Sequence, residues 1–206
     1  NEQIVDRLNA GTPTIYEVGL EEYLRRNLAS GRLRFTSDAD AAIRDAEIVF
    51  LAVGTPPLAS GGADLSQVDA AVSTIASNLN SYKVVVTKST VPVGTNAWIK
   101  ELLRERTGNG NFSVVSNPEF LREGRAIQDF FHPDRVVIGY EEERAREYME
   151  DVYRALYLIQ TPMVWCNLET AELIKYASNA FLATKITFIN QMAQLAEAVG
   201  GDVHAI

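Results

Sequence analysis

Residues 84–95 read VVVTKSTVPVGT, and this stretch decides the fold class of the chain. Its first half is β-branched, which is typical of a buried strand, and the strand ends abruptly at two hydroxyl side chains, Ser89 and Thr90. The proline and glycine that follow cannot continue a hydrogen-bonded ladder. The pattern predicts a core strand over 83–88 whose end opens onto a loop that lines a cleft.

Strands and helices alternate on both sides of this stretch, which indicates right-handed crossovers and a doubly wound parallel sheet. Residues 47–53 read EIVFLAV and are continuously apolar from Ile48 onward, and this predicts a strand covered on both faces. Ser37 or Asp38 is expected to cap the third helix, and Asp64 the fourth. The predicted strands cover 33–38, 47–53, 83–88, 112–116, 134–139 and about 162–165. The predicted helices cover 1–10, 19–31, 39–44, 65–79, about 95–106 and 142–157.

A long helical segment follows the last strand, from Glu169 to about Val199. At about 1.5 Å per residue it would be near 45 Å long. Its apolar residues lie on more than one stripe, so we expect it to be buried on several sides and to bridge domains or subunits. We place the domain boundary near Cys166, which divides the chain into residues 1–165 and 166–206.

Composition and charge exclude several classes of function. The net charge of −8 over 206 residues argues against broad binding of nucleic acid or an anionic membrane surface, which needs a basic face. A lysine and a few backbone N–H groups can still bind a phosphate locally. No apolar run approaches the length of a membrane helix. The single cysteine, Cys166, excludes an internal disulfide and favours a reducing cytoplasm.

Three core strands end in similar loops. The loops read GTPP at 54–57, STVPVG at 89–94 and NPEF at 117–120. In a parallel sheet these ends share one edge, and ligands of open α/β sheets bind beyond it. The alternative is that these are ordinary connecting loops and that Thr95 merely caps the next helix. Three such loops on one edge favour a ligand site without naming the ligand.

Two pairs of polar residues stand four positions apart. If the segment 117–125 is helical, Glu119 and Glu123 share a face, and their repulsion would supply an acid or a base. The alternative is a solvated turn in which neighbouring arginines pair with them. Lys175 and Asn179 would also share a helical face and could present an ammonium and an amide to a developing oxyanion. Their alternative is an exposed stripe on a half-wet helix.

The remaining reactive side chains are interpreted as structural. His132 lies in a turn before a strand, His204 lies near the end of the chain, and both are taken as structural or incidental. Cys166 follows a tryptophan at a strand end and is expected to be an apolar filler rather than a nucleophile. The sequence has no zinc-type spacing, no HExxH, no GxxxxGK[ST] and no GxSxG, so no metal site is expected.

Taken together, six motifs in order resemble the UDP-glucose 6-dehydrogenase family over essentially the whole chain. They are PTIYEVGLEEYL (13–24), VGTPP (53–57), KSTVPVGT (88–95), SNPEFLREG (116–124), HPDRVVIG (132–139) and TAELIKYASNAFLATKITFINQMA (170–193). The expected fold class is α/β: a doubly wound parallel, Rossmann-like sheet, N-terminally incomplete and followed by a long central helix. Residues 1–165 would be the NAD-binding domain, and 166–206 the start of a helical dimerisation domain.

The resemblance implies NAD-dependent oxidation of the sugar C6 of UDP-glucose to a carboxylate, giving the UDP-glucuronate used in polysaccharide biosynthesis. The residues implied in NAD binding are Val53, Gly54, Thr55, Pro56, Ser89, Thr90 and Glu123. Those implied in binding the sugar nucleotide are Glu119, Phe120, Leu121, Arg122, Glu123, Lys175 and Asn179. For catalysis it implies that Glu119 activates water to hydrolyse a thioester and that Thr90 holds a catalytic water. Lys175 and Asn179 would act at the reacting oxygen.

Two family features are absent from the sequence, and both bear on activity. The glycine-rich GxGxxG turn that cradles a pyrophosphate is missing, and Cys166 does not match the family's nucleophilic cysteine segment. The chain is therefore expected to be an internal piece that does not turn over UDP-glucose alone. The alternatives are a dehydrogenase of GDP-mannose or UDP-N-acetylmannosamine, or a non-catalytic nucleotide-sugar binding module. The apolar long helix favours a homodimer or a larger oligomer.

Overall fold

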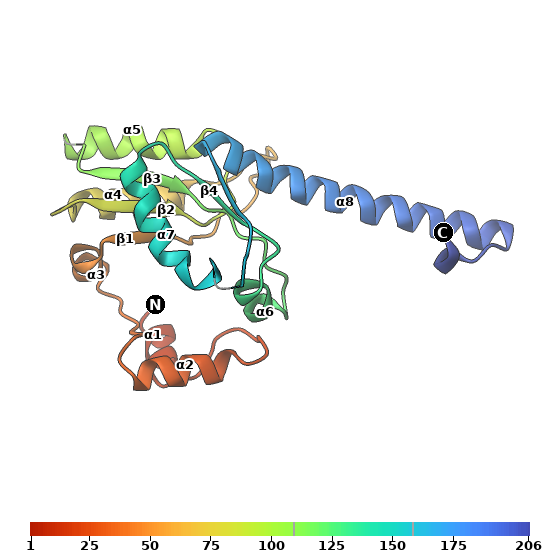
Figure 1. Cartoon of the computed structure of the whole chain (residues 1–206), viewed down its shortest axis with the longest axis horizontal. Coiled ribbons are helices and arrows are strands. Elements are labelled where there is room, and N and C mark those ends of the chain that lie inside the picture. The colour runs from red at the N-terminus through yellow and green to blue at the C-terminus, as the bar shows by residue number, and fades with distance from the viewer. Residues whose placement is uncertain (109, 158) are drawn as a thin grey trace.

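The computed structural model describes residues 1–108, 110–157 and 159–206, and Figure 1 shows a sheet flanked by helices from which one long helix extends. The strands, in the order in which they lie in the sheet, are β1 (Ile48–Leu51), β2 (Lys83–Thr87), β3 (Phe112–Ser116), β4 (Val136–Gly139) and β5 (Met163–Cys166). The helices are α1 (Glu2–Asn9), α2 (Leu20–Ala29), α3 (Ala39–Asp45), α4 (Ser66–Ser77), α5 (Thr95–Thr107), α6 (Ala126–Phe131), α7 (Glu143–Tyr157), α8 (Leu168–Val199) and the 3-10 turn η1 (Val203–Ala205).

The expected α/β sheet is confirmed, but it is mostly rather than wholly parallel. Strands β1, β2 and β3 pair in parallel, and so do β4 and β5. Between them, β3 and β4 pair antiparallel through Ser116 and Gly139. After β3 the segment 117–125 stays at the carboxyl edge of the sheet, so β4 starts from that edge and must run back the opposite way. The prediction of a fully parallel sheet is therefore wrong at this one junction.

Strand β2 lies between the two clusters of core residues, which explains the run of valines at 84–86. Side chains alternate along a strand, so Val85 points to one face and its two valine neighbours point to the other. Val85 packs with residues of α4 and α5, whereas Val84 and Val86 pack against α7. Each fully buried valine contributes about 1.5–3 kcal/mol relative to an exposed one. The two helical layers therefore depend on the same strand.

Two strand predictions fail, each for a local reason. Among the described residues β1 pairs with β2 alone, and Phe50 is 40% exposed, so the apolar run is not covered on both faces. Residues 33–38 form no strand, because the backbone of Phe35 is bound by a side-chain amide instead of a neighbouring strand. Asn9 Nδ2 donates to Phe35 O at 2.9 Å, and Phe35 N donates to Asn9 Oδ1 at 3.1 Å.

The helices follow the predicted ranges closely, and their caps differ in detail. Asp38 caps α3 as predicted, since its Oδ1 accepts from Ala41 N at 2.9 Å. Helix α4 begins at Ser66, one residue later than predicted, and its N-cap is Leu65 rather than Asp64. Asp64 Oδ1 still accepts from Ser66 N at 2.9 Å. Helix α6 was not predicted, because its six residues are too few for a periodic pattern.

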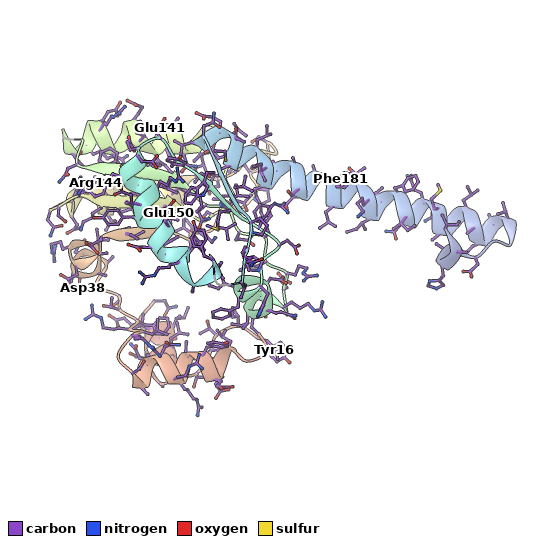
Figure 2. All side chains as sticks on the ribbon, viewed as in Figure 1. Tyr16, Asp38, Glu141, Arg144, Glu150 and Phe181 are labelled. Atoms are coloured by element: carbon purple, nitrogen blue, oxygen red, sulfur yellow. The ribbon has the colours of Figure 1, made fainter. Side chains whose placement is uncertain are left out.

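Helix α8 packs on the sheet only through its beginning, and near its end Ala196 is buried beside Gly201, which contradicts the expectation of burial on several sides. Its first turn lies on Gly139 of β4, where an added Cβ would come within 2.7 Å of Ala171 Cβ. Figure 1 shows the rest of the helix leaving the body of the molecule, and Figure 2 shows Phe181 where it does so. The exposed large apolar side chains of this stretch are Phe181, Leu182, Ile186, Phe188, Ile189, Leu195 and Val199.

A buried carboxylate joins α8 to the helix after β2. Glu172, 2% exposed, accepts from Gly94 N at 2.6 Å, Asn96 N at 2.8 Å and Asn96 Nδ2 at 2.7 Å. These backbone N–H groups belong to the first turn of α5, where a negative charge is stabilised by the helix dipole. The expected cap, Thr95, instead donates its hydroxyl to Pro92 O. A residue from a distant helix therefore closes this helix end.

We predict that Glu172→Ala lowers the free energy of unfolding by about 3 kcal/mol, because it leaves buried N–H donors without the charged acceptor. Urea denaturation of the chain measures this change. Glu169→Ala is the matched control, because Glu169 lies on the same helix but is exposed, and it should cost only a few tenths of a kcal/mol. Equal stability losses in the two variants would contradict the assigned role of Glu172.

Candidate functional site

The loops after β1 and β2 are bonded to each other and form one edge of the site. Ser89 Oγ donates to Val53 O at 2.6 Å, and Thr55 Oγ1 donates to Thr90 O at 2.8 Å. These two bonds cross between neighbouring strand ends, as expected for parallel strands. We call residues 53–56 with Ser89 and Thr90 the β1–β2 rim. The structure thus brings together six of the residues predicted to bind the cofactor.

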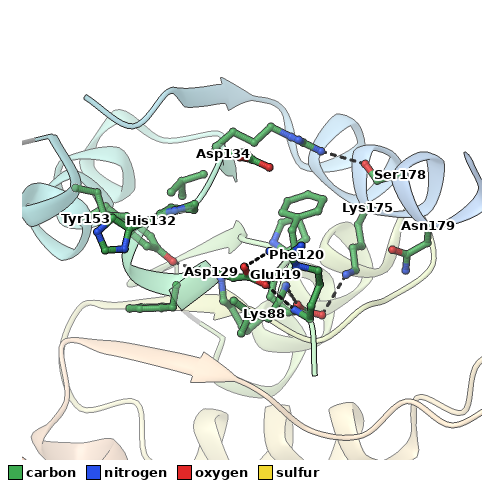
Figure 3. A pocket seen from close by; sticks show the side chains of 18 of the residues that line it. Lys88, Glu119, Phe120, Asp129, His132, Asp134, Tyr153, Lys175, Ser178 and Asn179 are labelled. Carbon is green, nitrogen blue, oxygen red and sulfur yellow. Dashed lines mark hydrogen bonds and ion pairs between the residues drawn. The ribbon is translucent and has the colours of Figure 1, made fainter. Parts of the chain in front are cut away.

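A cavity of about 370 Å³ lies beside this rim, and Figure 3 shows the side chains that line it. Its walls come from the segment after β3, from the turn between α6 and β4, from α7 and from α8. Six of the seven residues predicted to bind the sugar nucleotide line it: Glu119, Phe120, Leu121, Arg122, Lys175 and Asn179. Glu119 and Lys175, which are 56 positions apart in the sequence, therefore line the same cavity.

An ion pair lies at the centre of this cavity. Lys175 Nζ contacts Glu119 Oε1 at 3.1 Å, and Lys175 is only 7% exposed. The second carboxylate oxygen of Glu119 accepts from Leu121 N at 2.5 Å, which fixes its orientation. Asn179 lies one turn after Lys175 and lines the same cavity, so the predicted shared face is confirmed. The ammonium and the amide both face the space that a ligand would fill.

The cavity is lined by basic side chains that were not predicted from the sequence to lie there. The guanidinium of Arg135 lies 4.6 Å from the centre of the Phe120 ring and donates to Ser178 Oγ at 3.2 Å. Lys88 and His132 also line the cavity. Lys88 is a residue to which the sequence analysis gave no role, and His132 was interpreted as incidental. A cavity rich in lysine and arginine suits an anionic ligand such as a diphosphate.

Glu123 does not join Glu119, which corrects the predicted carboxylate pair. The segment 117–125 is not helical, so the two residues do not share a face, and Glu123 is exposed and outside the cavity lining. In the alternative interpretation Arg122 and Arg125 pair with these acids, but Arg122 pairs with Asp129 at 2.6 Å. The hydrogen bond from this guanidinium lowers the pKa of Asp129 to about 2. The cavity thus has Glu119 rather than a Glu119–Glu123 pair as its carboxylate from this segment.

A carboxylate near the start of the chain holds the far end of the same segment. Glu17 Oε1 accepts from Gly124 N at 2.9 Å, and Glu17 Oε2 accepts from Ala126 N at 3.2 Å. The Tyr23 ring stacks on Phe131 at a centroid distance of 5.2 Å and adds a second contact between α2 and α6. The segment that carries Glu119 is therefore fixed at both ends.

Cys166, predicted from the sequence to be an apolar filler, is half-buried in the structure. It ends β5 with its Sγ 3.8 Å from Ile138 O, and burial raises the pKa of its thiol. A raised pKa disfavours the thiolate, which is the nucleophilic form. Cys166 also lies outside the cavity lining. His204 lies in η1, and its backbone N–H donates to Asp202.

The fold and the site together define an α/β domain with a polar cavity at the carboxyl ends of β2 and β3. The chain belongs to the UDP-glucose/GDP-mannose dehydrogenase family. The NAD-binding domain of that family matches residues 1–157, and its central domain matches residues 169–206. The first match confirms NAD as the expected cofactor.

Individual relatives agree with this assignment. The chain is 53% identical over 205 residues to a UDP-glucose 6-dehydrogenase of Rhizobium meliloti (strain 1021), covering 98% of the chain and 47% of that protein. A solved UDP-glucose dehydrogenase from Pyrobaculum islandicum is 47% identical, with a TM-score of 0.94 over 100% of this chain and 48% of that one. A GDP-mannose dehydrogenase from Pseudomonas aeruginosa is 34% identical, with a TM-score of 0.95 over 100% and 48%. The chain therefore spans about half the length of these relatives.

Within residues 1–108, 110–157 and 159–206, no helix combines the length and the apolar character needed to cross a bilayer. Helix α8 is long enough at 32 residues, but its polar side chains break every apolar stretch.

We predict that Glu17→Ala makes the amide hydrogens of Gly124 and Ala126 exchange at least about tenfold faster, because both lose a charged acceptor. Hydrogen exchange followed by NMR measures these two amides directly. Glu21→Ala serves as the control, since Glu21 is exposed on α2 and forms an i,i+4 pair with Arg25. Unchanged exchange in Glu17→Ala would show that this carboxylate does not hold the segment.

Proposed function

We propose that this chain supplies the NAD-binding domain and part of the substrate site of an enzyme that oxidises UDP-glucose to UDP-glucuronate. The observation that carries this proposal is the ion pair between Glu119 and Lys175 inside the cavity, with Asn179 beside it. Family membership and the UDP-glucose 6-dehydrogenase relative at 53% identity support the choice of reaction and of sugar.

The β1–β2 rim fits NAD by the chemistry of its donors and acceptors. It presents backbone groups of the segment 53–56 and the partly exposed residue Thr90, which suit ribose hydroxyls and a carboxamide. Val53, Gly54, Thr55, Pro56, Ser89 and Thr90 would hold the cofactor there. When bound, NAD accepts hydride from the sugar carbon. A contact of Glu123 with the nicotinamide stays a prediction.

The cavity residues would then manage charge and protons at the sugar. The ammonium of Lys175 and the amide of Asn179 would stabilise negative charge on the C6 oxygen, a role that needs fixed donors in a partly buried site. Glu119, already ionically paired, would accept a proton or activate water, with Thr90 holding that water. The segment from Glu119 to Arg122 would lie along the sugar nucleotide.

The proposal also covers the domain organisation and the oligomeric state of the protein. Residues 1–165 would form the NAD-binding domain, and residues 166–206 would begin the central domain. The exposed apolar side chains of α8 favour a homodimer or a larger oligomer, because an apolar stripe of this length is unstable in water. The single cysteine suits the reducing cytoplasm.

The direct test is an assay of the intact protein that carries this chain, with NAD and each candidate sugar. UDP-glucose should give NADH and UDP-glucuronate at a higher kcat/KM than GDP-mannose or UDP-N-acetylmannosamine. Calorimetry with the same sugars separates binding from catalysis. Tight binding without any formation of NADH would replace the enzyme with a non-catalytic binding module, and a preference for another sugar would change the substrate.

We predict that Lys175→Met in the intact protein lowers kcat by roughly 100-fold or more, because a preorganised donor to the developing oxyanion is lost. Steady-state kinetics with UDP-glucose measures the change. Lys185→Met is the matched control, since Lys185 is exposed on the same helix and should leave kcat within about twofold. The assigned role fails if Lys175→Met raises KM alone and leaves kcat unchanged.

A further inference from the structure

A second lysine, Lys88, enters the cavity from the end of β2 and has none of the roles proposed above. Its Nζ donates to Asn117 Oδ1 at 3.1 Å and to the Tyr153 hydroxyl at 3.4 Å. It lines the same cavity as Glu119 and Lys175, and Figure 3 shows the three residues together. An ammonium held by two neutral oxygens and only partly open to solvent is costly unless a negative charge lies near it.

The Asn117 side chain that binds Lys88 is held in one orientation. Asn117 is fully buried, its N donates to Thr87 O at 2.9 Å, and its Nδ2 donates to Val137 O at 2.8 Å. Its Oδ1 also accepts from the Tyr153 hydroxyl at 2.5 Å. Asn117 therefore joins β2, β3, β4 and α7, and its side-chain oxygen has a fixed direction. A donor bound to such an oxygen is positioned by the sheet itself.

We propose that Lys88 is a positioning residue for Glu119 in the reaction proposed above. Its ammonium, fixed on Asn117, is a second cation in the lining of the cavity that holds the Glu119 carboxylate. Its charge holds that carboxylate in place when Lys175 turns its hydrogen bonds to the sugar oxygen. The catalytic role in this inference rests on the proposed function, but the electrostatic coupling between Lys88 and Glu119 does not.

The electrostatics of Lys88 agree with this geometry. Burial lowers the pKa of Lys88 to about 8, while the charge of Glu119 raises it and the charge of Lys175 lowers it. The Tyr153 phenol stays neutral over the working range, because burial raises its pKa to about 12. The other charged or titratable groups that line the cavity are Arg122, Asp129, His132, Asp134 and Arg135.

The electrostatic support that Lys88 gives to Glu119 depends on pH. Below about pH 8 Lys88 is protonated and its charge attracts the Glu119 carboxylate, and this attraction is lost as the pH rises through that value. Because the pKa of Lys88 is below that of an unfolded lysine, the unfolded state binds more protons between these two values. The Lys88 contribution to stability therefore increases over the same range in which its catalytic support decreases.

The first arm of the test is the pH dependence of kcat in the intact protein with Lys88→Arg and Lys88→Met, measured between about pH 6 and 10. The unaltered protein should lose activity near pH 8. Lys88→Arg should retain activity to higher pH, because its guanidinium stays charged. Lys88→Met should lower kcat about tenfold at pH 7 and show no loss centred near pH 8. If both variants keep the unaltered pH profile, the inference is overturned.

The second arm needs neither activity nor a variant of Lys88. NMR titration of the Lys88 ammonium, in the unaltered protein and in Glu119→Gln, measures the coupling directly. Glu119→Gln should lower the pKa of Lys88, whereas Glu123→Gln should leave it unchanged because Glu123 lies outside the cavity lining. An unchanged pKa in Glu119→Gln overturns the inference. Failure of the unaltered protein to reduce NAD would reject the proposed function instead, and the titration would still decide whether Lys88 and Glu119 are coupled.

Discussion

The buried carboxylate of Glu172 is the interaction on which the site depends. It closes the first turn of α5, the helix that follows the Ser89–Thr90 loop, and it lies one helical turn before Lys175 on α8. One side chain therefore fixes the distance between the β1–β2 rim and the ammonium in the cavity. A carboxylate in this position satisfies donors that would otherwise be buried without partners, so the arrangement is stable only when both helices are in place.

The other elements place the remaining groups around that constraint. Gly139 lets α8 approach β4 closely, and Asn117 connects three strands to α7 at the point where the cavity begins. Glu17 binds the Gly124 end of the segment that carries Glu119. Glu119, nearer the other end of this segment, pairs with Lys175. The result is a cavity whose polar groups are oriented by the scaffold rather than by flexible loops. Such preorganisation is what electrostatic catalysis requires.

Several features that depend on residues close together in the sequence were predicted correctly. β-Branched runs located the core strands, and the four-residue spacing of Lys175 and Asn179 placed both on one face of a helix. The direction of β4, the cap on α5 and the role of Lys88 depend on contacts between residues far apart in the sequence, so no short pattern could show them. The prediction that Glu119 and Glu123 share a face was wrong because it assumed a helix. Glu119 instead binds the backbone of Leu121, and the segment turns at Gly124. The exposed apolar face of α8 shows that periodicity predicts an apolar surface without showing what covers it.

A crystal structure of the intact protein with NAD and UDP-glucose bound tests the central claim most directly. The account predicts that Glu172 remains bonded to the start of α5 and that the nicotinamide lies against Thr90. The C6 oxygen of the sugar should then lie within hydrogen-bond distance of Lys175 and Asn179. A sugar nucleotide bound away from this cavity, or a cofactor with no contact to the β1–β2 rim, would contradict it.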